Sequence, residues 1–315
     1  MAEAGPQKAL RDGSGRPAAA DARTRCGPGL LRLVLLLGPG LAVVLLLFGG
    51  GLALGLLQSL GHLPGAGLTR LEPAAFQRVL GDPDFPRSLV LTAYLSGVST
   101  LLAAMAGVAA ALVLHRLAGH SRLAHFVFQV PLTVPHLVVA VAMVFLLAPS
   151  GLLARLMVLA GLAEGPGDFP LLVHDPWGVG ILAAYVWKEI PFIALMVLAA
   201  LRQSGSELRD VGRTLAAGPW QRFRFITLPT LFPSLGAAAL IVFAYTFGAF
   251  EVPFLLGRTY PLSLPVWAYR HYSDVDLLAR PEGIALGLVI AAVVALAVVL
   301  AQILTRSARR RGVVL

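Results

Sequence analysis

The chain has 315 residues, of which 57% are hydrophobic and 13% charged, whereas soluble domains carry about 25% charged residues. This composition excludes an ordinary soluble domain and indicates a polytopic membrane protein. The net charge of +9 would suit nucleic-acid binding, but the charges follow a membrane topology, described below, so no nucleic-acid partner is expected. Cys26 is the only cysteine, which excludes an internal disulfide and a cysteine-based metal site.

Six hydrophobic segments follow one another, and each reaches the roughly 20 residues that cross about 30 Å of hydrocarbon. They lie near residues 30–57, 87–114, 124–147, 178–200, 231–256 and 282–304. The first is longer than the apolar core of a cleaved signal peptide, so a retained helix is favoured. The expected fold class is all-α and polytopic, with a six-helix membrane domain.

The segments outside this domain are short. Residues 1–28 are rich in Ala, Gly, Arg and Pro and are expected to form a disordered cytoplasmic tail. The membrane domain covers 29–305, and a basic cytoplasmic tail covers 306–315.

Lysine and arginine are distributed unevenly between the two sides of the hydrophobic segments. With the N-terminus inside, the connecting segments on the inner side hold seventeen Lys and Arg and five acids. The connecting segments on the outer side hold seven Lys and Arg and nine acids. The positive-inside rule therefore predicts that both termini are cytoplasmic. The basic composition reflects the topology of a multi-pass protein that contacts membrane lipids.

The second and third hydrophobic segments carry helix-packing and helix-breaking residues. In the second, small and hydroxyl residues recur at intervals of three and four, a pattern on which membrane helices pack closely. These residues are Ser88, Thr92, Ser96, Ser99, Thr100 and Gly107. In the third, Pro131 and Pro135 predict a break whose freed carbonyl groups need other partners. His136 beside the break either lines a pathway or is anchored at the membrane boundary.

Charged residues inside the fourth and fifth segments mark a candidate translocation pathway, because buried charges in a membrane pair or face water. Lys188 and Glu189 are neighbours, so they point about 100° apart on a helix and do not face one cavity. A structural role and a substrate contact both remain open for them. Glu251 either lines the pathway or meets water at the outer interface. The candidate pathway residues are Lys188, Glu189, Pro191, Tyr245, Phe250 and Glu251.

Residues 201–230, between the fourth and fifth segments, carry five arginines and differ from the lipid-like sequence around them. Ser204 and Glu207 have capping-box spacing, which predicts a helix start. Hydrophobic residues then recur at helical spacing from Leu208. An amphipathic helix against the membrane is predicted.

A second short helix is predicted after this one. Gly218 is expected to end the first helix, and Pro219 suits the first position of the next. The second helix presents Trp220 and Phe223 on one side and is expected to close before Pro229. The pattern is a helix, a sharp turn and a helix.

These residues resemble the EAA loop of the membrane-spanning permease subunits of ABC importers. Asp210-Val211-Gly212 stands where that family has Glu-Ala-Ala, Ala216 stands where it has Gly, and Ile226-Thr227-Leu228-Pro229 fits its Ile-x-Leu-Pro. In the family the loop inserts into a groove on a cytoplasmic ATPase, so the resemblance implies an ATPase-coupling role. The residues concerned are Asp210, Val211, Gly212, Ala216, Gly218, Pro219, Trp220, Phe223, Leu228 and Pro229.

The resemblance extends from the second hydrophobic segment to about residue 304 and implies the type I ABC importer permease fold. It implies a bacterial plasma (inner) membrane, separate ATPase subunits that bind the ATP, and a second permease subunit in a homo- or heterodimer. It also implies a periplasmic or lipoprotein solute-binding protein. The pattern is closest to the spermidine/putrescine, iron(III) and thiamine permeases, which implies polyamine, iron or thiamine-like cargo.

The chain lacks the motifs of the common hydrolases. Lys8 and Lys188 are its only lysines, no phosphate-binding Gly-x-x-x-x-Gly-Lys-Ser/Thr occurs, and neither His-Glu-x-x-His nor Gly-x-Ser-x-Gly is present. No enzyme activity and no cofactor of its own are expected. The alternative is an ion-coupled secondary transporter that uses Lys188, Glu189 and Glu251, although no internal repeat supports it.

Overall fold

A computed structural model describes residues 30–116, 122–203 and 216–310. Within these ranges, six helices are long and apolar enough to cross a membrane, which confirms the predicted fold class. They span Arg32–Ser59, Phe85–Arg116, His136–Leu159, Val179–Gln203, Pro219–Gly248 and Leu277–Arg306. The predicted tail 1–28 lies outside the described residues, as does the end of the basic tail beyond Arg310.

The chain forms two compact units, which comprise residues 1–52 and 53–315. The described part of the first unit contains α1 (Leu30–Val44) and a wider π-helical turn (Leu45–Gly49). Helix α2 (Gly50–Ser59) follows without interruption. Pro39 lies inside α1, and large hydrophobic side chains of α1 are exposed, as a lipid-facing helix requires.

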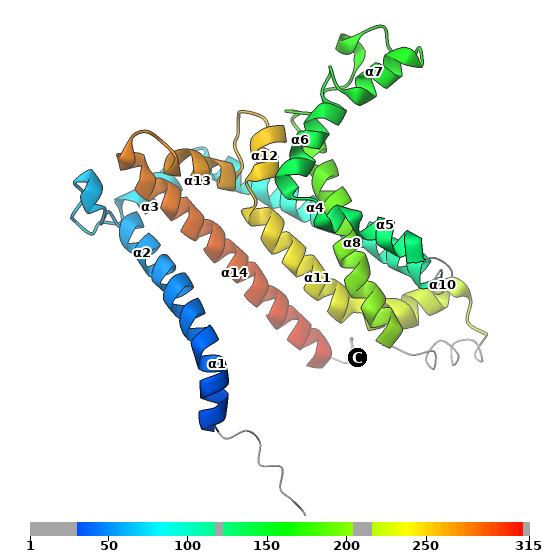
Figure 1. Ribbon diagram of the computed structural model, residues 1–315, viewed down its shortest axis with the longest axis horizontal. Coiled ribbons are helices and arrows are strands. Elements are labelled where there is room, and N and C mark those ends of the chain that lie inside the picture. The colour runs from blue at the N-terminus through cyan, green and yellow to red at the C-terminus, as the bar shows by residue number, and fades with distance from the viewer. Residues whose placement is uncertain (1–29, 117–121, 204–215, 311–315) are drawn as a thin grey trace, which may run out of the picture. The chain divides into compact units, whose positions relative to one another are not determined.

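Three helices form the centre of the second unit, namely α4 (Phe85–Arg116), α8 (Val179–Gln203) and α11 (Leu228–Gly248) (Figure 1). The predicted small and hydroxyl face of α4 is buried, which confirms the packing pattern. Thr92 Oγ1 donates to Ser88 O at 2.7 Å and Ser96 Oγ to Thr92 O at 2.8 Å, so these hydroxyls find partners on their own helix. The close packing of α4 against α8 therefore involves no unpaired hydroxyl at these two positions.

Gly107 lies where α4 approaches α8 closely. A Cβ atom at Gly107 would lie 2.8 Å from Ile193 Cγ2 and 2.9 Å from Ile193 Cβ. Ile193 is fully buried and its β-branched side chain is stiff in a helix, so it has little room to move. Only glycine fits this contact without displacing α8.

We therefore expect Gly107→Ala to lower the free energy of unfolding by about 1–3 kcal/mol, the usual effect of overpacking. Denaturation in detergent micelles measures it. The matched control is Gly97→Ala on the same helix, where a Cβ would meet no described atom within 4 Å. Equal stability of the two variants would show that the contact at Gly107 is not tight.

The third hydrophobic segment is broken as predicted. Helix α5 (Arg122–Thr133) ends before Val134–Pro135, and α6 (His136–Leu147) begins directly after it. Pro135 lacks an amide hydrogen, so the helical bond that it would donate to Pro131 O is missing. The candidate span His136–Leu159 comprises α6, which ends at Leu147 as predicted, and the separate short helix α7 (Leu152–Leu159).

The fifth hydrophobic segment is interrupted near its C-terminal end. Helix α11 ends at Gly248, and the short α12 (Glu251–Leu256) follows after two residues. This confirms the bend expected beside Gly248 and Pro253.

The prediction that the helix opened by Pro219 closes before Pro229 is wrong. Helix α10 (Pro219–Arg222) continues through a π-helical turn (Phe223–Thr227) directly into α11. The helix continues past Pro229 through this wider turn, and Thr230 Oγ1 donates to Ile226 O at 2.6 Å. The described end of the loop, from Pro219, and the fifth span are therefore one continuous helix.

Shorter helices gather where the connections between spans lie. Helices α3 (Ala74–Gly81) and α13 (Leu264–Tyr272) both contact α14 (Arg280–Arg310) (Figure 1). Three-residue 3₁₀ turns lie at Pro64–Ala66, Pro166–Asp168 and Leu277–Ala279. The buried residues Val79, Phe247, Leu264, Leu286 and Ile290 form the core of this part.

Candidate functional site

Lys188 forms hydrogen bonds with backbone carbonyls at the break in the third hydrophobic segment. Its side chain is 5% exposed, and Nζ donates to Pro131 O at 2.7 Å and to Leu132 O at 3.2 Å. Pro131 O is the carbonyl that Pro135 leaves without a helical donor. The geometry thus favours the structural role of Lys188 over contact with substrate.

Glu189 joins a second set of contacts around the same break. Its Oε1 lies 3.3 Å from His136 Nε2, and the His136 ring lies 4.6 Å from the Tyr245 ring, centroid to centroid. These side chains come from α8, α6 and α11, so three helices meet through them. Lys188 and Glu189 therefore point to different partners, as their adjacency predicts.

Tyr185, one turn before Glu189, extends this group, which we call the His136 cluster: His136, Tyr185, Glu189 and Tyr245. Tyr185 is 1% exposed, and its hydroxyl has no hydrogen-bond partner among the described residues. Tyr185 is not among the candidate pathway residues predicted from the sequence, although its spacing of four from Glu189 places both on one helix face.

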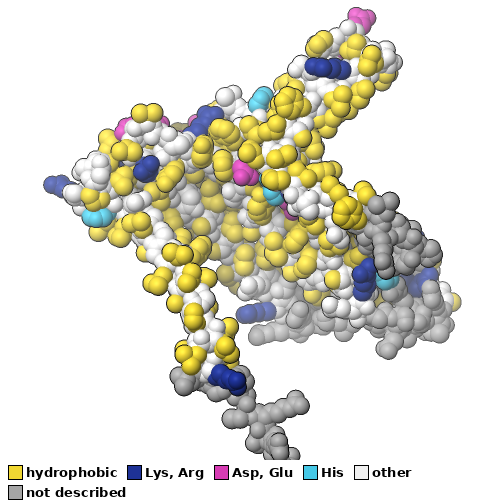
Figure 2. Space-filling view, in the orientation of Figure 1, with side chains coloured by type: hydrophobic (Ala, Val, Ile, Leu, Met, Phe, Trp, Pro, Cys, Tyr) yellow, Lys and Arg dark blue, Asp and Glu magenta, His cyan; other side chains and the backbone are white. Residues whose placement is uncertain are grey.

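The remaining candidate pathway residues lie around this cluster. Phe250 stacks on Tyr269 of α13, with ring centroids 4.8 Å apart, so it belongs to an aromatic contact beside the bend. Glu251 begins α12 and is half-buried, and Pro191 is buried within α8. Figure 2 shows acidic and histidine side chains among hydrophobic ones where α6, α11 and α12 meet. Polar groups therefore interrupt an otherwise hydrophobic surface at this level.

The candidate coupling residues are described only in part. Asp210, Val211 and Gly212 lie outside the described residues. Ala216 has φ of +52°, in the left-handed region that favours glycine, the residue of the EAA pattern at this position. Gly218, at φ −64°, precedes α10, and its N–H donates to Gln221 Oε1 at 2.9 Å.

Helix α10 and the turn after it have one exposed and one packed side. Trp220 is 68% exposed, and its ring lies 5.5 Å from that of Phe223. Phe223 packs against the buried cluster of α4, α8 and α11, and Leu228 and Pro229 are half-buried at the start of α11. An exposed aromatic side chain is thus attached to the core of the membrane domain.

The described residues offer no metal centre, since no three His, Cys, Asp or Glu side chains among them gather closely enough to hold an ion. The arrangement provides a polar cluster between helices and an exposed helix connected to it.

Comparison with protein families identifies one match. The family model described as binding-protein-dependent transport system inner membrane component matches residues 103–311. The molybdenum transport system permease protein ModB of Mycobacterium tuberculosis is 25% identical over 227 residues, which cover 70% of this chain and 80% of that protein. The sulfate transport system permease protein CysW of a Synechocystis species is 29% identical over 223 residues, which cover 69% of this chain and 76% of that protein.

Solved structures share the fold. A bacterial alginate ABC transporter, in complex with an alginate pentasaccharide-bound periplasmic protein, contains a chain that aligns with a TM-score of 0.69 at 22% identity. The alignment covers 88% of this chain and 94% of that one. The MetNI methionine ABC transporter aligns with a TM-score of 0.52 at 19% identity, over 70% and 94% of the two chains.

Proposed function

The chain belongs to the family of binding-protein-dependent transport system inner membrane components, and from this premise we propose that it is the permease subunit of an ABC importer for a tetrahedral oxyanion such as molybdate or sulfate. The observation that carries the proposal is its similarity along most of its length to permeases named for molybdenum and sulfate transport. ATP is bound and hydrolysed by separate subunits, and a binding protein delivers the anion.

This cargo replaces the sequence-based expectation of a polyamine, iron or thiamine-like solute. That expectation came from the resemblance to the spermidine/putrescine, iron(III) and thiamine permeases, and the acids Glu189 and Glu251 were only compatible with a cation. Glu189 contacts His136 and is 8% exposed, so its charge is engaged within the protein. Because a paired carboxylate repels an anion less than a free one, Glu189 does not argue against an oxyanion.

Coupling to the ATPase operates through the continuous helix from Pro219 to Gly248. Its first turns expose Trp220, and its last third carries Tyr245 of the His136 cluster. A rigid helix transmits a displacement of one end to the other, so movement of the ATPase shifts Tyr245 against α6 and α8. Asp210, Val211, Gly212 and Ala216 complete the surface that the ATPase contacts.

The His136 cluster, with Phe250 and Glu251 beside it, lies on the translocation pathway. The buried Tyr185 hydroxyl has no described partner and can donate to an oxygen of the passing anion. Lys188 and Pro191 hold α8 and the broken α5–α6 segment in place. Substrate contact and helix positioning are thus divided between neighbouring residues.

An ion-coupled secondary transporter is not favoured. It requires Lys188 and Glu189 to exchange partners or protons during transport, yet Lys188 Nζ is bound to two backbone carbonyls that have few other donors. It also leaves the exposed aromatic of α10 without a role.

Purification from native membranes in a mild detergent tests the assembly. We expect the chain to co-elute with an ATPase and with a second permease subunit, either a copy or a sister. Sulfate- or molybdate-loaded binding protein is expected to stimulate ATP hydrolysis, whereas putrescine, iron(III) and thiamine are not. A chain that elutes alone and takes up solute in response to a proton gradient would contradict the proposal.

A further inference from the structure

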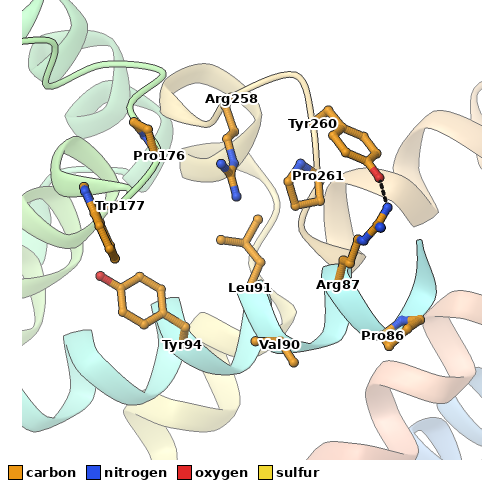
Figure 3. A pocket seen from close by; sticks show the side chains of 10 residues that line it. All are labelled: Pro86, Arg87, Val90, Leu91, Tyr94, Pro176, Trp177, Arg258, Tyr260 and Pro261. Atoms are coloured by element: carbon orange, nitrogen blue, oxygen red, sulfur yellow. Dashed lines mark hydrogen bonds between the residues drawn. The ribbon is translucent and has the colours of Figure 1, made fainter. Parts of the chain in front are cut away.

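A hollow of about 640 Å³ lies at the first turns of α4, apart from the His136 cluster (Figure 3). Its walls come from α4, from Pro176 and Trp177 ahead of α8, and from the loop after α12. The positive-inside rule predicts that all three segments are at the outer surface. The hollow therefore faces the side from which cargo arrives.

Two arginines line this hollow, and their surroundings differ. Arg87 Nη1 lies 3.1 Å from Asp84 Oδ1 and also donates to Tyr260 Oη, so its charge is compensated. Arg258 points into the space above Leu91 (Figure 3). Its Nε is buried and has no hydrogen-bond partner among the described residues. A buried guanidinium N–H without a partner is costly, so the site favours an acceptor.

A narrower cavity of about 20 Å³ continues from the hollow and shares Arg258 with it. Ser263 lines this cavity, is 5% exposed, and has an Oγ without a hydrogen-bond partner in the described part of the chain. Ser263 also immediately precedes α13, whose first turn carries the positive end of the helix dipole. Arg258 thus lines both spaces, whereas Ser263 lines only the narrow cavity, which has room for about one water.

One acid shares this place. Asp175 lines the narrow cavity and is 4% exposed. Its oxygens accept from Trp177 N at 2.9 Å and from Val179 N at 2.9 and 3.1 Å, so the start of α8 engages the carboxylate. Its hydrogen-bonding capacity is directed at the backbone, and Arg258 keeps an unused donor.

We propose that this hollow is an outer oxyanion-binding site of the permease itself, in which the Arg258 guanidinium holds two oxygens of the anion and Ser263 Oγ reaches the anion through one water in the adjoining narrow cavity. The anion's identity as sulfate or molybdate rests on the proposed function, whereas the site rests on the geometry. A guanidinium recognises a planar pair of oxygens through two parallel N–H bonds, a geometry that any face of a tetrahedral oxyanion offers. Arg258 would hold the anion between its release from the binding protein and its entrance into the membrane.

Equilibrium binding of radiolabelled sulfate to the purified permease–ATPase complex in nanodiscs, without binding protein, tests the site. Arg258→Gln is expected to raise the sulfate Kd about tenfold or more, and Ser263→Ala about threefold, as loss of hydrogen bonds to a charged group predicts. Arg258→Lys keeps the charge but not the paired donors, so we expect an intermediate loss. The matched control is Arg270→Gln, an exposed arginine of α13 that does not line the hollow.

Each result decides something. Wild-type sulfate affinity in folded Arg258→Gln and Arg258→Lys complexes would overturn the site. So would an Arg258→Gln variant that loses only affinity for the binding protein, because the arginine would then bind a carboxylate of that partner. ATP-driven import separates the two proposals. Sulfate that binds at Arg258 but is not imported contradicts the proposed function alone.

Discussion

Replacing Lys188 with methionine is expected to lower the free energy of unfolding by about 2–4 kcal/mol, since it removes the ammonium donor from two backbone carbonyls of the break, Pro131 O and Leu132 O. Methionine keeps the length and apolar stem of lysine, so the change removes the ammonium and little else. Pro131 O and Leu132 O have no other donor close by, because Pro135 and the helix break remove the usual amides. Thermal unfolding in detergent, followed by circular dichroism, measures the loss.

Arg202→Met supplies the control for this prediction. Arg202 lies in the last turn of the same helix and is exposed, so its replacement is expected to change stability by less than about 0.5 kcal/mol. If Lys188→Met were as stable as Arg202→Met, the carbonyls of the break would have found other partners, and Lys188 would be free for a role in transport.

Gly218→Trp is expected to reduce ATP-driven uptake about tenfold or more while the protein still inserts and folds. Gly218 has φ of −64°, which any residue adopts, and a Cβ there would meet Gln221 Oε1 only at 3.7 Å. The fold therefore tolerates the new side chain. A bulky ring beside Trp220 instead overpacks the contact with the ATPase, at a cost of about 1–3 kcal/mol, and 1.4 kcal/mol corresponds to tenfold in affinity.

The measurement compares uptake, ATP hydrolysis and membrane abundance in one preparation. Gly236→Trp is the matched control, because Gly236 is exposed on the same continuous helix and a Cβ there would meet no described atom within 4 Å. Full uptake by Gly218→Trp would mean that the start of α10 does not touch the ATPase.

Local features of this fold followed from local sequence. Length and hydropathy predicted the six spans, and the prolines predicted the breaks at Pro135 and beyond Gly248, because both effects act within a few residues. The predicted helix end before Pro229 was wrong because it considered only the local effect of the proline. Proline lacks an amide in any context, but only the folded chain shows that the helix continues past Pro229 through a π-helical turn.

The contacts of the site depend on residues far apart in the chain. Lys188 meets carbonyls 57 and 56 positions away, and Glu189 meets His136 at a separation of 53. Sequence spacing showed that the side chains of Lys188 and Glu189 point in different directions, but it did not show which residues each would contact. The pairing of Glu189 with His136 could therefore not be predicted from the sequence.

Arg258 and Ser263 carried no sequence signal at all. Each is an ordinary residue of an outer connection, and neither belongs to a motif. Their significance is that both have buried polar atoms without partners beside one hollow, a property of packing rather than of sequence.

ATP-dependent uptake of radiolabelled sulfate and molybdate into proteoliposomes tests the central claim most directly. The vesicles contain this chain with its ATPase and second permease subunit, with ATP inside and the loaded binding protein outside. The account predicts uptake that requires ATP and the binding protein and that excess unlabelled sulfate or molybdate suppresses, whereas putrescine does not. Accumulation without ATP, or ATP-driven uptake of putrescine but not of either oxyanion, would contradict it.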